Sequence, residues 1–198
     1  MINTGKPIMS KDYQTVMTPE FRLCFPNLFK PTSFEGSTRE TYNCVMVFPK
    51  GADLSKLKEI AKAAFNKTFP NGAKGARSPF RDGNEKADEW GEVFKDATFI
   101  RAASNIKPGV ADRRKQLITD EEQVYSGCYA RAIVHAFAYN VKGNKGVSFG
   151  LDAIQITREG ERLGGGAYAI NMFDDLGDDD SAEGSNSAPA EADDDMFA

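Results

Sequence analysis

The stretch SGCYARAIVHAFAYNVKGNKGVSFGLDAIQITR, residues 126–158, decides the fold class. Residues 126–141 and 146–158 are rich in β-branched, aromatic and small apolar residues, which is typical of strands. The four residues between them, KGNK at 142–145, contain the glycine that a short hairpin connection needs. We therefore expect two long antiparallel strands joined by a tight turn.

The second of these strands changes the side on which its apolar residues lie. Val147, Phe149 and Leu151 share one parity, whereas Ile154 and Ile156 share the other. A β-bulge near residues 152–153 would realign the two sets. Because bulges bend strands at the corners of barrels, the phase change favours a sheet that closes on itself.

Three further segments of the sequence have strand-like patterns. Residues 18–29 alternate through Phe21, Leu23 and Phe25, and we expect Pro26 to close this strand. The other two strands are predicted at residues 42–48 and 97–103.

A change of period after residues 42–48 indicates a helix over residues 54–69. Asp53 can cap its start, apolar residues recur on one stripe, and Pro70 follows its end. The glycine-rich, charged stretch at 71–92 is predicted to be a long loop, and long loops in compact domains are usually functional or mobile. The fold class is thus mainly β with one or two helices (α+β), and we expect an OB-fold-like Greek-key barrel of five to six strands.

The charge of the chain is divided between two regions. The net charge is −4, but residues 174–198 contain ten acidic and no basic residues, which leaves 25 basic and 19 acidic residues in 1–173. A body of about +6 attached to an acidic tail indicates a nucleic-acid partner for the body, or a plain domain with a solubilising tail. We expect a flexible N-terminal arm at 1–16, the folded domain at 17–173 and a disordered acidic tail at 174–198.

The sequence also indicates the cellular compartment of the protein. The chain has no run of about 20 apolar residues and no signal-peptide pattern at its start, so we predict no membrane span and a location in the cytoplasm. Its three cysteines, Cys24, Cys44 and Cys128, are far apart and lie in strand patterns, which favours reduced thiols. The sequence leaves the oligomeric state open, with a homodimer as one option.

Alternation along residues 127–139 defines the first set of candidate binding residues. One parity is made of small residues, which suits a tightly packed interior. The other parity interleaves rings with basic groups, a pattern typical of surfaces that stack bases and neutralise phosphates. The alternative is that these rings belong to the core. The candidates on this parity are Tyr129, Arg131, His135, Phe137 and Tyr139.

A second candidate set lies in the loops and on their neighbouring strands. Basic side chains there could close over a bound strand, and two aromatic residues among them could stack on bases. The alternative is that the charges are merely solvated and that Trp90 anchors its loop to the domain. The set comprises Arg77, Phe80, Arg81, Lys86, Trp90, Arg101, Arg113, Arg114, Lys115, Lys142 and Lys145.

Catalytic motifs are missing from the sequence. His135 is the only histidine, which excludes zinc sites built on several histidines and leaves a Ser-His-Asp triad dependent on one residue. There is no C-x-x-C and no phosphate loop of the G-x-x-x-x-G-K-[ST] type. We therefore predict a binding protein without enzymatic activity, cofactor or metal.

The stretch 126–166 also carries a family resemblance. Its most specific parts are GCY (127–129), FAY (137–139) and GVSFGLDAIQ (146–155). With much of 17–173 it resembles a family of tailed-phage proteins, long described as being of unknown function. The resemblance implies an OB-fold that binds single-stranded DNA.

The end of the tail carries a second resemblance. Asp193, Asp194, Asp195, Met196 and Phe197 are similar to the acidic tips of bacterial and phage single-stranded DNA-binding proteins, which recruit replication partners. Those tips usually end on the phenylalanine, whereas here Phe197 precedes Ala198. A partner that reads both the ring and the terminal carboxylate would bind this tip differently.

These observations together predict a sequence-independent single-stranded DNA-binding protein of a phage, which protects DNA in replication and recombination. The acidic tail is expected to compete with DNA for the basic body and to recruit replication proteins. Two alternatives stay open: a strand-annealing recombination protein, and a non-enzymatic interaction or scaffold module.

Overall fold

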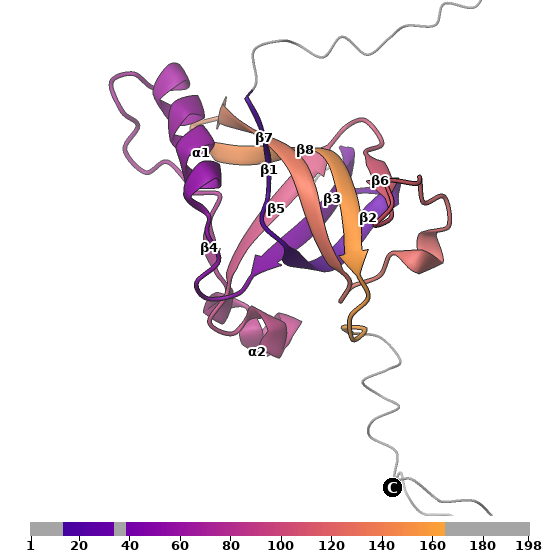
Figure 1. The fold of residues 1–198 in the computed structure, drawn as a ribbon. Coiled ribbons are helices and arrows are strands. Elements are labelled where there is room, and N and C mark those ends of the chain that lie inside the picture. Colours follow the sequence, from indigo (N-terminus) through magenta and orange to yellow (C-terminus); the bar gives the residue numbers. More distant parts are fainter. Residues whose placement is uncertain (1–13, 34–38, 165–198) are drawn as a thin grey trace, which may run out of the picture.

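The computed structural model describes residues 14–33 and 39–164, which form a closed β-barrel with a helix beside it (Figure 1). Five long strands build the barrel: β2 (Phe21–Ser33), β3 (Glu40–Phe48), β5 (Thr98–Ser104), β7 (Tyr129–Val141) and β8 (Asn144–Arg158). Neighbours around the barrel are antiparallel except for β5 and β8, which are parallel, and β7 closes the ring by pairing with both β8 and β2. This is the Greek-key order of an OB-fold, and the predicted fold class is confirmed.

Three short strands extend the sheet beyond the predicted five to six. β1 (Thr15–Met17) pairs with β7, β4 (Arg81–Asp82) pairs with β5, and β6 (Gly109–Ala111) runs parallel to β8. Strands of two or three residues carry too little alternation to be recognised in a sequence. The boundary expected for the N-terminal arm, at residue 16, lies within β1.

The hairpin that decides the fold has the expected form. β7 and β8 pair along their whole lengths, and the turn between them uses Lys142 and Gly143, both with positive φ. In the register, Ile133 faces Ala153 and Val134 faces Leu151, so Asp152 is the extra residue of a bulge. The predicted bulge at 152–153 is confirmed.

The first long strand does not end at Pro26, as the sequence suggested. β2 continues to Ser33, and its register with β3 shifts between Cys24 and Asn27. Phe25 has φ +48° at this irregularity. Because a bulged residue leaves the hydrogen-bond ladder, Pro26 is accommodated there without the loss of a bond.

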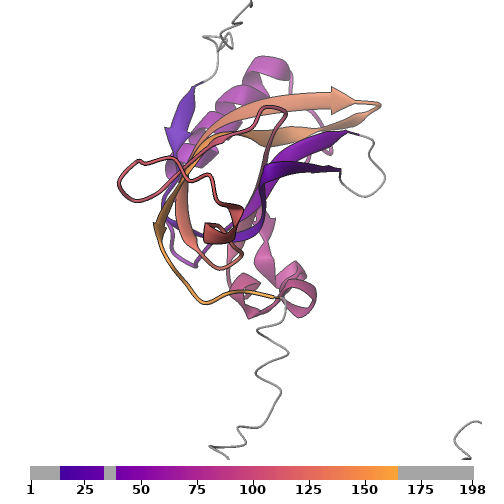
Figure 2. The ribbon, with the colours of Figure 1, turned by 90° about the vertical axis from the view of Figure 1, so that its right-hand side faces the viewer.

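The interior of the barrel is one apolar core, around which the five strands curve (Figure 2). Cys44, Met46 and Phe48 of β3 point into it. The helix α1 (Ser55–Thr68) matches the prediction at 54–69 and contributes Leu57 and Ile60 to the same core. The N-cap residue is Leu54, which makes no side-chain cap bond, so the expected cap by Asp53 is wrong by one residue: Asp53 precedes the N-cap, and its Oδ1 accepts a hydrogen bond from the backbone N–H of Ser55 at 3.0 Å.

A second, smaller core lies on the outer face of β2, β3 and β5. Val45 and Val47, of opposite parity to the first core, are buried there together with Phe99. The covering segment holds the 3-10 helices η1 (Gly83–Glu85) and η2 (Glu92–Phe94) and the short helix α2 (Ala87–Trp90). Much of the stretch expected to be a loop at 71–92 is therefore folded onto the barrel. A third 3-10 helix, η3 (Glu121–Gln123), precedes β7.

No helix within residues 14–33 and 39–164 is long and apolar enough to cross a membrane.

Candidate nucleic-acid interface

The outer face of β7 carries the ring-and-cation row that the alternation predicted. Ala130, Ala132, Val134 and Ala136 are buried in the barrel, so the small parity does face the interior. Tyr129, Arg131, Ile133, His135, Phe137 and Tyr139 are half-buried on the other face. These side chains are therefore accessible from outside the barrel and do not belong to its core.

Two glycines of β8 make room for rings of this row. The backbone register places Gly150 opposite His135 and Gly146 opposite Tyr139. A Cβ atom at Gly146 would lie 2.6 Å from the Tyr139 hydroxyl oxygen, and one at Gly150 would collide with the ring of His135. Both rings thus lie over the β8 backbone, in the space that a side chain there would fill. His135 Nδ1 is also 2.9 Å from the carboxylate of Asp152, the bulged residue.

Five of the candidate residues meet in one groove at the hairpin end of β7. The groove has a volume of about 740 Å³ and lies between the segment 77–85 and strands β5, β7 and β8. We call it the arginine groove. Its lining contains the predicted residues Arg77, Phe80, Arg81, Arg101 and Tyr139, together with Ser78, Pro79, Asp82, Glu85, Val147 and Ser148.

Backbone contacts hold the segment 77–85 against the barrel. The N–H of Arg77 donates to Lys145 O at 2.9 Å, and the N–H of Val147 donates to Arg77 O at 3.1 Å. Further along, Phe80 packs edge-on against the core residue Phe149, with ring centroids 5.9 Å apart. These contacts fix the segment 77–85 against the barrel, and the segment forms one wall of the groove.

The groove concentrates positive charge. Desolvation by the surrounding groove, and then the nearby charge of Arg81, lower the pKa of Arg101 from its ordinary value. A guanidinium stays protonated even so, which means that two cations are held close together. Arg81 is bonded to Glu85 at 3.0 Å and lies over the ring of Phe99. Such a cluster is suited to an anionic ligand.

A second basic pocket lies at the other end of the β7 row. It has a volume of about 380 Å³, and we call it the Gln155 pocket. Its lining is Glu20, Arg113, Arg131, Gln155, Thr157 and Arg158. Beside it, the ring of Tyr129 lies between the guanidinium carbons of Arg22 and Arg158, which are 4.6 and 3.1 Å from its centroid. A hydrogen bond with Arg22, and to a smaller extent one with Arg158, lowers the pKa of Tyr129.

Some candidates lie outside both pockets. Trp90 packs against Phe25, Phe94 and Phe99 with ring centroids 5.3–5.6 Å apart, so it anchors the segment that covers the second core. Lys86 lies over the Trp90 ring and is paired with Glu89.

The remaining candidates occupy turns. Lys142 and Lys145 lie at the β7–β8 hairpin, next to the arginine groove. Arg114 and Lys115 are exposed at a turn after β6, where Asp112 Oδ1 accepts the N–H groups of Arg114 and Gln116 at 2.8 Å each. The partner-binding candidates 193–197 lie outside the described residues.

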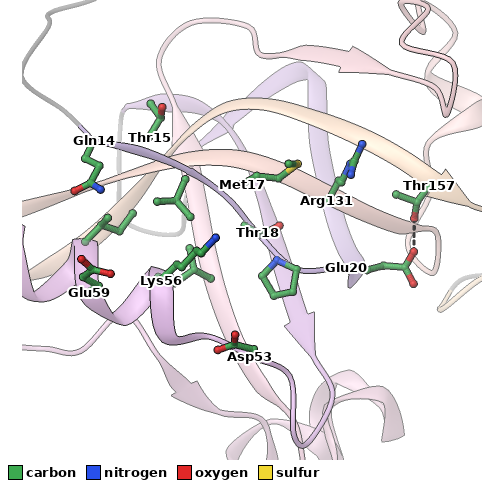
Figure 3. A pocket seen from close by; sticks show the side chains of 14 residues that line it. Gln14, Thr15, Met17, Thr18, Glu20, Asp53, Lys56, Glu59, Arg131 and Thr157 are labelled. Carbon is green, nitrogen blue, oxygen red and sulfur yellow. Dashed lines mark hydrogen bonds between the residues drawn. The ribbon is translucent and has the colours of Figure 1, made fainter.

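Another pocket has a different character. It has a volume of about 790 Å³ and lies between β1 and α1 (Figure 3). Its charged residues are of both signs, with Lys56 and Arg131 against Glu20, Asp53 and Glu59. This mixture gives no preference for a polyanion. In the described part of the chain no three His, Cys, Asp or Glu side chains come together as a metal site.

Six residues of the groove lining were not among the sequence candidates, namely Ser78, Pro79, Asp82, Glu85, Val147 and Ser148. Ser148 could have been found from the hairpin register, which places it opposite Phe137. Glu85 enters the groove through a fold of the 77–85 segment that leaves no periodic signal in the sequence.

Comparisons with known proteins identify the family and the fold. The family model described as "Enterobacter phage Enc34, ssDNA-binding protein" matches residues 14–183. Protein p50 of Acyrthosiphon pisum secondary endosymbiont phage 1 is 30% identical over 169 residues, which is 78% of this chain and 90% of that protein.

Two solved structures show the same fold at low sequence identity. The single-stranded DNA-binding protein of bacteriophage Enc34, in complex with ssDNA, matches with a TM-score of 0.64 and 18% identity, over 76% of this chain and 89% of that one. The single-stranded DNA-binding protein gp2.5 of bacteriophage T7 matches with a TM-score of 0.57 and 12% identity, over 75% and 93% of the two chains.

Proposed function

We propose that this chain, which belongs to the family of the Enterobacter phage Enc34 ssDNA-binding protein, binds single-stranded DNA in the arginine groove without regard to sequence. The observation that carries the proposal is the convergence of three guanidiniums and two rings in one groove. Guanidiniums neutralise phosphates, and rings stack on any base because every base has a π face.

The arginines, the two rings and the hairpin lysines have different roles in this proposal. Arg77, Arg81 and Arg101 contact the phosphates, and Tyr139 stacks on a base from the floor provided by β8. Phe80 forms the opposite wall. Lys142 and Lys145 at the hairpin add positive charge where the strand leaves the groove.

The acidic tail completes the proposed function. Residues 174–198 carry ten negative charges and no positive ones, so they can occupy the basic surface of the 17–173 domain when DNA is absent. DNA would displace the tail and free residues 193–197 for a replication protein. The chain would thus protect single strands during phage replication and recombination in the host cytoplasm, without catalysing a reaction.

Fluorescence anisotropy tests the proposal. Labelled oligo-dT and a duplex of equal length are titrated with the full chain, and then with a chain that ends after residue 173, over a series of salt concentrations. We expect a preference for oligo-dT and a plot of log Kobs against log[salt] with a slope of about −2 or steeper, because each of three neutralised phosphates contributes about −0.7 on a single strand.

The truncated chain should bind more tightly at low salt, where the tail competes best. Equal binding by both chains would refute the competition by the tail. A chain that binds neither oligo-dT nor duplex at low salt would refute the DNA-binding function itself.

A further inference from the structure

The arginine groove and the Gln155 pocket lie at opposite ends of one strand face. Tyr139 lines the groove and Arg131 lines the pocket, and both belong to the outer row of β7. They are eight residues apart, which corresponds to roughly 27 Å along a strand.

Gln155 organises the second pocket. In the sheet it is paired with Arg131 of β7 on one side and with Ala111 of β6 on the other. Its Oε1 accepts a hydrogen bond from Arg131 Nε at 2.8 Å, and its Nε2 donates to Asp112 O at 2.9 Å and to Arg113 O at 3.3 Å. One amide thereby holds the guanidinium of Arg131 and the main chain at Arg113.

These bonds leave the pocket ready for an anion. Because Gln155 engages the Nε of Arg131, the two terminal nitrogens of that guanidinium remain as donors for a phosphate. Arg113 is exposed, and its main chain is held by Gln155. The pocket's single lining carboxylate, Glu20, is bonded to Thr157 at 2.6 Å and to Arg158 at 2.9 Å.

The face between the two pockets offers a path for a strand. Its β7 side carries Ile133, His135 and Phe137, and their partners on β8 are Ala153, Gly150 and Ser148. All three partners are small, and the ring of His135 lies over Gly150, so a strand on this path would contact that ring there rather than the backbone of β8. The half-buried ring of Phe137 can stack on a base along the same path.

We propose that the Gln155 pocket is a second phosphate-binding site, which holds the same DNA strand whose other part lies in the arginine groove. Arg113 and Arg131 bind the phosphate, and Gln155 is the positioning residue. This inference rests on the proposed function, and it adds that an oligonucleotide must be long enough to reach both sites. At the B-form rise of about 3.4 Å per nucleotide, a strand needs about eight nucleotides to span roughly 27 Å, and an extended strand needs fewer.

A length series of oligo-dT tests the second site. The full chain and its variants Arg113→Ala, Arg131→Ala, Gln155→Ala and Arg101→Ala are titrated with labelled oligonucleotides, from lengths too short to span both pockets to lengths well above that limit. Lys62→Ala serves as the matched control, because it removes one exposed positive charge from α1, outside both pockets.

We expect a length-dependent loss at the Gln155 pocket. On long oligonucleotides, Arg113→Ala and Arg131→Ala should each bind about five- to tenfold more weakly, with a salt slope about 0.7 shallower for the one lost phosphate contact. On the shortest ones, both should bind like Lys62→Ala, whereas Arg101→Ala should weaken binding at every length. Gln155→Ala changes no charge, so a shallower salt slope on long oligonucleotides would reflect mispositioned arginines.

The outcomes separate the inference from the proposed function. If wild-type protein binds and Arg101→Ala weakens it, but Arg113→Ala matches Lys62→Ala on long oligonucleotides, the second site is refuted and the groove is retained. Equal losses at all lengths for Arg113→Ala and Arg131→Ala would refute it as well. Because Arg113 is exposed and outside both cores, its substitution keeps the test valid even where Gln155→Ala lowers stability.

Discussion

Replacement of Glu85 by glutamine should tighten DNA binding. Glu85 lines the arginine groove and holds Arg81 at 3.0 Å, with the two side chains 58% and 52% exposed. A phosphate that enters the groove must compete with this carboxylate for Arg81 and is also repelled by it. Asp82, the other carboxylate of the lining, accepts bonds from the backbone and side chain of Asn84 and has a structural role there.

The size of the effect follows from two contributions. Breaking an exposed ion pair costs about 0.2–1 kcal/mol. Repulsion between unit charges about 7 Å apart in water adds about 0.6 kcal/mol. A gain of about 1 kcal/mol corresponds to roughly fivefold tighter binding at low salt. At 1 M salt the Debye length is about 3 Å, and the gain should disappear.

Anisotropy titrations with oligo-dT at low and high salt measure this gain. Glu59→Gln is the control, because it removes the same charge from α1, outside the arginine groove. Urea unfolding of both variants separates changes in binding from changes in stability. If Glu85→Gln binds no better than Glu59→Gln at low salt while both remain folded, a phosphate does not engage Arg81 and the groove is not the DNA path.

Three further predictions concern other sites in the chain. Tyr139→Ala should weaken binding of oligo-dT by about 1–3 kcal/mol, which is about 5- to 150-fold, whereas Tyr139→Phe should bind nearly as the wild type does, because stacking needs only the ring. Burial raises the pKa of the Cys44 thiol to about 12, so alkylation at pH 8 should be negligible in the native protein and rapid after unfolding in urea, as followed by mass spectrometry. Hydrogen bonds from Thr157 and then Arg158 lower the pKa of Glu20 below its ordinary value of 4.5, so its ionised form stabilises the fold above that pH. The difference in free energy of unfolding between wild type and Glu20→Gln should therefore shrink as the pH falls through the lowered pKa, and a difference that grows on acidification would contradict this assignment.

The candidate residues on β7 could be predicted because a strand has a strict period of two. Once residues 127–139 are taken as a strand, Tyr129 and Tyr139 must share the face opposite Ala132. The composition of the two parities then indicates which one faces the core. The bulge at Asp152 followed from the same rule, since the apolar parity of β8 changes at that residue.

The loop residues could not be placed by such a rule. Arg77 reaches the groove because its backbone bonds to Lys145 and Val147, about 70 positions further along the chain. Nothing periodic in residues 71–92 indicates that pairing. The same limit explains why Trp90 and Arg81, grouped together in the sequence, separate in the structure: Trp90 packs onto the second core, and Arg81 borders the groove.

The second core also explains where the open binding face lies. In OB-folds, oligonucleotides commonly bind across the second and third strands of the barrel, which are β3 and β5 here. The segment 83–97 buries Val45, Val47 and Phe99 on that face, so a DNA strand cannot cross it there. Arg101, further along β5, remains exposed, and it faces the groove together with Tyr139 of β7. Under the proposed function, the covered part of the common face leaves β7 and β8 as the path of the strand, between the arginine groove and the Gln155 pocket.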